Sequence, residues 1–179
     1  MTDNLFFDTD CLSAFLWIND TNILQALYGG KIVLPDAVYS ELSNPSIPHI
    51  KKRTDELINA NVAIVQEIKV GTTEYLLFDS LVKGINGEIK IGRGEAAGIA
   101  LAKTYNGILA SNNYRDIAPY IKKYQLQHID TGHILIEAMN KKIITETEGN
   151  VIWQKMLDKN RMLPAKSFTE YLAYSENSK

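Results

Sequence analysis

Residues 92–116 predict a helix, a strand and a polar turn in direct succession, and this order allows few folds. The alanine-rich run at 96–102 is a good helix former, and Asn-Gly at 106–107 ends the helix because glycine accepts a left-handed conformation. Ile-Leu-Ala at 108–110 is a short, fully apolar strand of the kind buried in parallel sheets. Ser-Asn-Asn at 111–113 then turns the chain into the next helix. These three parts make up two-thirds of a βαβ unit.

The same alternation recurs along the whole chain. Short strands are predicted at 5–7, 31–34, 62–65 and 128–130, the first three of them largely apolar, and helical patterns lie between them. Strands that alternate with helices indicate an α/β fold with a mostly parallel central sheet. No linker rich in Pro, Gly or Ser divides the chain, and its 179 residues suffice for one domain with a sizeable core.

Composition excludes several classes of protein. The chain has three His and one Cys, too few for a cysteine-rich zinc site, and a lone Cys excludes an internal disulfide. A reducing, cytoplasmic compartment is therefore expected. No apolar run approaches the roughly 20 residues of a membrane span, so no membrane partner is expected. The net charge of −2 provides no general attraction for nucleic acid, although a bound metal ion would supply local positive charge.

Acidic residues stand near the ends of the predicted strands. Asp8 follows the first strand, Glu95 begins the helix of the opening segment, and Asp116 follows the strand of that segment. Glu41 lies on the helix after the second strand. Because the carboxyl ends of parallel strands meet at one edge of a sheet, we expect these carboxylates to converge there.

A cluster of carboxylates is unfavourable unless a cation joins it, because like charges raise one another's pKa. Oxygen ligands without Cys or clustered His select Mg²⁺ or Mn²⁺ over zinc, and such an ion suits the hydrolysis of a phosphodiester bond. Taken singly, three of the acids also have structural explanations. Glu41 could be a solvated charge, Glu95 a complement to the helix dipole, and Asp116 the N-cap of the following helix. Asp8, directly after three apolar residues, is expected deep in the fold.

Four short motifs, taken in chain order, resemble those of the PIN-domain nucleases. They are Asp8-Thr9, then PDAVYSEL at 35–42, GEAAGIALA at 94–102 and SNNYRD at 111–116. The resemblance runs from about residue 5 to residue 144. It implies a three-layer α/β/α fold around a parallel sheet and divalent-metal-dependent cleavage of RNA, as in many toxins of bacterial and archaeal toxin–antitoxin pairs. The implied cofactor is Mg²⁺ or Mn²⁺, the implied substrate is RNA, and the implied partner is an antitoxin protein, with a homodimer as a further assembly.

The resemblance also assigns the catalytic acids by their positions in the motifs. Asp8, Glu95 and Asp116 would be the metal ligands. Glu41 would be a fourth catalytic acid, either as a ligand or as a support for one.

Polar residues beside these acids match further family positions. Thr9 matches the hydroxyl after the first Asp, and Asn113 matches a polar residue that precedes the last acid in toxin-like members. Arg93 and Arg115 flank the motifs and are expected to contact RNA phosphates. Some family members carry acids where this chain has Asn112 and Asn113, which leaves Asp116 as the fourth acid.

The resemblance divides the chain into a PIN-like nuclease domain at 1–144 and a C-terminal helical extension at 145–179 packed on the same domain. Both helices of the extension begin with a capping-box pattern: Thr145 with Glu148, and Ser167 with Glu170. The extension is expected to cover the site or to carry a partner interface.

Two other functions fit parts of the sequence. Residues 6–10, FFDTD, also resemble the first motif of haloacid-dehalogenase-like phosphatases, with Asp8 as nucleophile and Asp10 as acid/base. In that interpretation Glu41 and Glu95 have no role. The remaining interpretation is a PIN-like binding scaffold without catalysis, whose acids hold no metal, and the two asparagines of the last motif are its main support.

Overall fold

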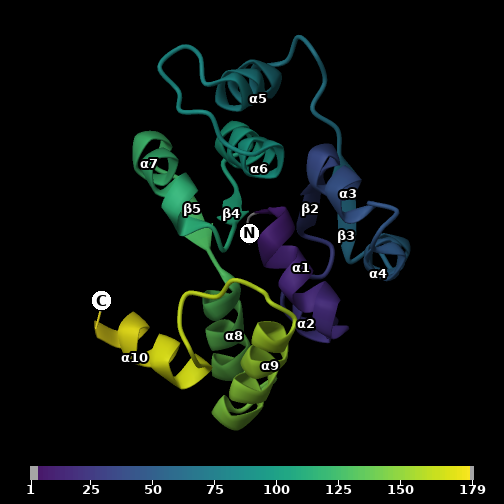
Figure 1. Ribbon diagram of the computed structural model, residues 1–179, viewed down its shortest axis with the longest axis vertical. Helices are drawn as coiled ribbons and strands as arrows, with labels where there is room; N and C mark the ends of the chain where they lie inside the picture. The colour runs from purple at the N-terminus through teal and green to yellow at the C-terminus, as the bar shows by residue number, and fades with distance from the viewer. Residues whose placement is uncertain (1–3, 178–179) are drawn as a thin grey trace.

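The computed structural model describes residues 4–177 and shows a five-stranded parallel sheet with helices on both faces (Figure 1). The strands are β1 (Leu5–Phe7), β2 (Ile32–Pro35), β3 (Ala63–Gln66), β4 (Ile108–Ala110) and β5 (Gln127–Ile129). Their order across the sheet is β3-β2-β1-β4-β5, and each adjoining pair is parallel. The predicted α/β fold with a parallel central sheet is confirmed, and β1 is its middle strand.

Helices connect the strands and cover the sheet. They are α1 (Thr9–Ile18), α2 (Asn22–Tyr28), α3 (Asp36–Leu42), α4 (Pro48–Asn59), α5 (Thr73–Lys83), α6 (Arg93–Thr104), α7 (Tyr114–Tyr124), α8 (Thr131–Asn140), α9 (Glu146–Asp158) and α10 (Phe168–Asn177). None of the helices within residues 4–177 is long and apolar enough to cross a membrane.

Two hydrophobic cores lie on opposite faces of the sheet. Successive side chains of a strand alternate between its faces, so Leu5 and Phe7 of β1 enter one core and Phe6 enters the other. The first core includes side chains of α1, α4, α8 and α9, and the second includes side chains of α5, α6 and α7. Helices on both faces of one sheet form the three-layer α/β/α arrangement that the resemblance implied.

The two C-terminal helices pack into the first core. Trp153 of α9 and Phe168 of α10 are fully buried, and their ring centroids lie 6.0 Å apart. Trp153 Nε1 donates a hydrogen bond to the Ala165 carbonyl at 3.0 Å. Residues 145–177 therefore share a core with α1 and α8, and the division of the chain at residue 144 stays a prediction.

The capping patterns of these helices form to different degrees. Thr145 and Glu148 exchange both hydrogen bonds of a capping box, as predicted. At α10 the Ser167 hydroxyl accepts from the Glu170 N–H at 3.1 Å. The Glu170 carboxylate accepts instead from the Lys166 N–H, one residue before Ser167, so only half of the second box forms.

Close packing at two glycines leads to a stability prediction. A Cβ on Gly149 would lie 2.4 Å from the Phe168 ring, and a Cβ on Gly132 would lie 2.3 Å from the Tyr171 ring. We expect Gly149→Ala to lower the free energy of unfolding by about 1–3 kcal/mol through overpacking, even though Ala is the better helix former. Urea unfolding measures the change. Val151→Ala, at an exposed position of the same helix, is the control and should stay within about 0.5 kcal/mol of the wild type. Unchanged stability of Gly149→Ala would contradict this packing of α10.

Candidate active site

Asp8 lies at the carboxyl end of β1 and caps α1. Its N–H donates to the Ala110 carbonyl at 2.9 Å, and its Oδ1 accepts from the Cys11 N–H at 2.7 Å. The side chain is buried, and its Oδ2 has no hydrogen-bond partner among the described residues. Burial raises the pKa of Asp8 to about 7; the Ser111 side chain and the Cys11 N–H oppose this shift, and the charges of Asp10 and Glu95 add to it. A buried carboxylate oxygen without a partner is unfavourable, so this position suits a cation or a donor.

A small cavity lies beside Asp8 at the carboxyl edge of the sheet. It has a volume of about 100 Å³ and is lined by Asp8, Thr9, Asp10, Glu41, Gly94 and Glu95. No Lys, Arg or His within residues 4–177 contributes to this lining. We call it the acid cavity. The structure thus brings three of the four predicted catalytic acids together, while their roles stay predictions.

Glu41 reaches the acid cavity from α3, and the Thr9 hydroxyl donates a hydrogen bond to its Oε2. The first turn of α6 approaches this pair closely. A Cβ on Gly94 would lie 3.1 Å from Thr9 Oγ1 and 3.3 Å from Glu41 Oε2. Because Gly94 has no side chain, Thr9 and Glu41 have space to contact each other beside α6.

Asn113 links Glu95 to Asp116. Its side-chain amide donates to Glu95 Oε1 at 3.3 Å and to Asp116 Oδ2 at 2.8 Å. The prediction that Asp116 caps α7 is wrong: the helix begins at Tyr114, so Asp116 lies within its first turn, where an acid still suits the helix dipole. Asp116 is exposed and does not line the acid cavity, so its connection to the cavity runs through Asn113 and Glu95.

Asn112 faces away from the acids. Its Oδ1 accepts from the Thr131 N–H at the start of α8, at 2.9 Å. Its Nδ2 is buried and has no hydrogen-bond partner in the part of the chain that the structure describes. Of the two asparagines in the turn, the structure brings Asn113 to the acids and places Asn112 against α8.

The two predicted phosphate-binding arginines lie on the surface. The guanidinium carbon of Arg93 stands 5.2 Å from the centroid of the Phe78 ring, and Arg93 lines a hollow of about 550 Å³ between α3 and α6. Glu41 lines both this hollow and the acid cavity, so the two spaces adjoin. Arg115 is exposed in the first turn of α7 and forms no ion pair with another described residue.

Three residues near the acids were not among those assigned to the nuclease site, although Asp10 was the acid/base of the phosphatase alternative. Asp10 lines the acid cavity, and its position two residues after Asp8, in the first turn of α1, was the available signal. Ser111 is fully buried and accepts from the Asn113 N–H at 3.2 Å, directly after β4. Gly94 was part of a motif, but the space that it leaves depends on how α3 and α6 pack.

The acid cavity has the donor chemistry of a divalent-cation site but not its side-chain spacing. Within residues 4–177, no three Asp, Glu, His or Cys side chains are close enough to one another to hold a metal ion as they stand. The chemistry of the lining nevertheless suits a hard cation, because its donors are carboxylate oxygens and Asp8 Oδ2 lacks a partner among them. The residues present therefore fit Mg²⁺ or Mn²⁺ better than zinc.

Sequence comparison identifies the family. The family model described as a PIN domain matches residues 5–177. The chain belongs to the PIN-domain family. This membership confirms the resemblance carried by the four motifs, and the match includes every strand of the sheet.

The 2.2 Å resolution structure of VapBC-1 from nontypeable Haemophilus influenzae contains a chain similar to this PIN domain. The two chains are 15% identical, with a TM-score of 0.48. The similarity covers 71% of this chain and 97% of that chain. No curated protein matches the sequence.

Proposed function

We propose that this PIN domain is a divalent-metal-dependent ribonuclease that hydrolyses phosphodiester bonds of RNA, and that it is the toxin of a toxin–antitoxin pair. Asp8, Glu95 and Asp116 would hold Mg²⁺ or Mn²⁺, with Glu41 as a further ligand or a support. The bound ion would polarise a phosphate and supply an activated water. An antitoxin partner, a homodimer and a cytoplasmic location belong to the same proposal.

The acid cavity is the observation that carries this proposal. Asp8 Oδ2 is buried there without a hydrogen-bond partner among the described residues, in a lining whose charged groups are all acids. A divalent cation would offset the repulsion between these carboxylates and satisfy the free oxygen. Arg93 and Arg115 are exposed outside the cavity, where they would contact RNA phosphates.

Two neutral side chains would position the acids. The Thr9 hydroxyl holds one oxygen of Glu41, which orients the carboxylate at the mouth of the acid cavity. The Asn113 amide holds one oxygen each of Glu95 and Asp116, which keeps these carboxylates near each other despite their like charges. These contacts use one carboxylate oxygen each of Glu41, Glu95 and Asp116, so the other oxygen of each would be available to a cation.

The direct test is metal-dependent cleavage. The purified protein is expected to cut single-stranded RNA with Mn²⁺ or Mg²⁺ present and to stop when EDTA removes the metal. Unpaired RNA is the favoured substrate because its backbone can approach the acid cavity without the constraint of a duplex. A gel assay on one labelled RNA, alone and annealed to its complement, measures both effects, and excess Mn²⁺ should restore cleavage after EDTA. Equal cleavage with and without EDTA would contradict metal dependence.

One alternative is favoured by a specific contact. The Asn113 amide donates to two carboxylates and so offsets part of the repulsion that a cation would otherwise offset. A PIN scaffold without catalysis would show neither Mn²⁺ binding nor Mn²⁺-dependent cleavage in the assay above. The phosphatase alternative has lost its basis, because the chain belongs to the PIN-domain family.

A further inference from the structure

Four aromatic rings from four elements lie in a row near the carboxyl edge of the sheet. They belong to Tyr114 of α7, His128 of β5, His133 of α8 and Tyr171 of α10. Successive ring centroids are 5.8, 6.5 and 5.8 Å apart. We call this set the ring row. The chemistry proposed for the acids uses none of these side chains.

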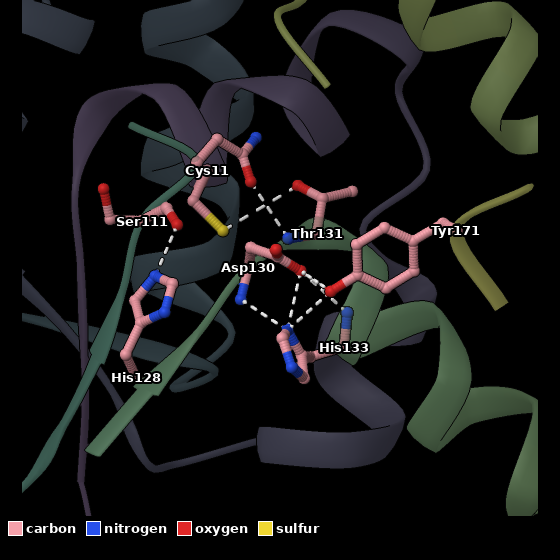
Figure 2. Close-up of polar contacts among 8 residues, drawn as sticks. Cys11, Ser111, His128, Asp130, Thr131, His133 and Tyr171 are labelled. Carbon is pink, nitrogen blue, oxygen red and sulfur yellow. Dashed lines mark hydrogen bonds and ion pairs between the residues drawn. The ribbon is translucent and has the colours of Figure 1, made fainter. Parts of the chain in front are cut away.

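Hydrogen bonds hold three rings of the ring row in place, those of His128, His133 and Tyr171 (Figure 2). His128 Nε2 donates to the Ser111 carbonyl at 2.8 Å. Asp130 Oδ1 lies 2.8 Å from His133 Nδ1 and 2.8 Å from the Tyr171 hydroxyl, so one carboxylate fixes two rings. Rings that are ordered before binding lose little conformational freedom when a ligand stacks on them.

Two members of the ring row are open to solvent, and one of them directly follows a residue that contacts the acids. Tyr114 is 60% exposed, and the side chain of His133 is 49% exposed. Tyr114 directly follows Asn113, whose amide contacts Glu95 and Asp116. The exposed Tyr114 therefore lies next to the residue that contacts these carboxylates and two residues before Asp116, one of the proposed metal ligands.

We propose that Tyr114 and His133 bind unpaired RNA bases by stacking, beside the phosphodiester bond that the acids would cleave. Stacking on an aromatic ring tolerates any base and requires a base that is free of a duplex. The protein has a net charge of −2 and an acidic cavity, so ring contacts would supply an attraction that its charges do not. This inference rests on the proposed ribonuclease function and states where the bases of its substrate lie.

The experiment is a titration of fluorescently labelled single-stranded RNA in EDTA, where the proposed cleavage cannot occur. Tyr114→Ala is expected to weaken binding about tenfold, the scale of one lost base stack. Tyr114→Phe keeps the ring and should keep the affinity. Tyr105→Ala is the matched control: Tyr105 is 51% exposed but lies before β4, at its amino end, and its loss should leave RNA affinity unchanged. Equal melting temperatures would show that both tyrosine variants are folded.

An abasic oligonucleotide of the same length separates base stacking from phosphate contacts, and the wild type and Tyr114→Ala should bind it equally. Equal affinity of these two proteins for intact RNA would overturn the inference, and the ring row would then be a candidate contact surface for a protein partner. Metal-dependent cleavage by the wild type would still support the ribonuclease in that case. A tenfold loss in Tyr114→Ala together with no cleavage by the wild type would keep the base-binding row and overturn the ribonuclease.

Discussion

Asp8→Asn is expected to reduce metal-dependent RNA cleavage by roughly a thousandfold, because a bound metal supplies several kcal/mol of stabilisation and each 1.4 kcal/mol is about tenfold in rate. The variant should also lose Mn²⁺ binding. Asparagine has nearly the same shape as aspartate, and its Oδ1 can still accept from the Cys11 N–H that Asp8 uses now. The metal-free variant should therefore be as stable as the wild type or more stable, since it buries no charge.

Calorimetry with Mn²⁺ and a thermal melt in EDTA check the two parts of this prediction. Asp158→Asn is the control, because Asp158 is exposed at the end of α9 and accepts a hydrogen bond from Gln154, far from Asp8 in the sequence. The control should bind Mn²⁺ and cleave RNA as the wild type does. Equal Mn²⁺ binding by the wild type and Asp8→Asn would remove Asp8 from the metal site.

Glu95→Gln is expected to lower cleavage by roughly a hundredfold or more. Replacing a residue that only supports a metal ligand typically costs about 10–100-fold, and a ligand itself should cost at least as much. Glutamine keeps an oxygen that can accept from the Asn113 amide, so the link to α7 can persist. Its metal-free melting temperature should be unchanged or higher, because the repulsion between Glu95 and Asp8 disappears. The variant thus separates a role in holding metal from a role in folding.

Metal-dependent stability provides a second measurement on Glu95→Gln. At a Mn²⁺ concentration about 100 times its Kd, the wild type should gain about 2.7 kcal/mol of stability, and the variant should gain less. Glu56→Gln is the control, since Glu56 is exposed on α4 and its nearest ion-pair partner, Lys52, lies 3.9 Å away. Equal stabilisation of the wild type and Glu95→Gln by Mn²⁺ would remove Glu95 from the metal site, and no stabilisation of either protein would favour the scaffold without catalysis.

The sequence by itself determined where the strands lie and to which family the chain belongs. β1 and β4 occupy their predicted ranges, and the other strands begin and end within one residue of theirs. All of these strands except β5 are short, largely apolar stretches bounded by turn and helix signals, so the local pattern predicts their positions. The capping box of Thr145 and Glu148 was equally predictable, because its partners are three residues apart. Four motifs in order sufficed for the PIN-domain family, which the family match confirms.

Only the tertiary structure decided which polar groups meet around the acids. Thr9 and Glu41 stand 32 residues apart, and Asn113 and Glu95 stand 18 apart, yet each pair is hydrogen-bonded. Asn112 and Asn113 are adjacent in a turn, but they face different elements, which their shared residue type did not reveal. The ring row likewise draws on four separate elements. Periodicity shows which face of one helix or strand is buried. The distance between side chains on different elements depends instead on the strand order and on how the helices pack across the sheet.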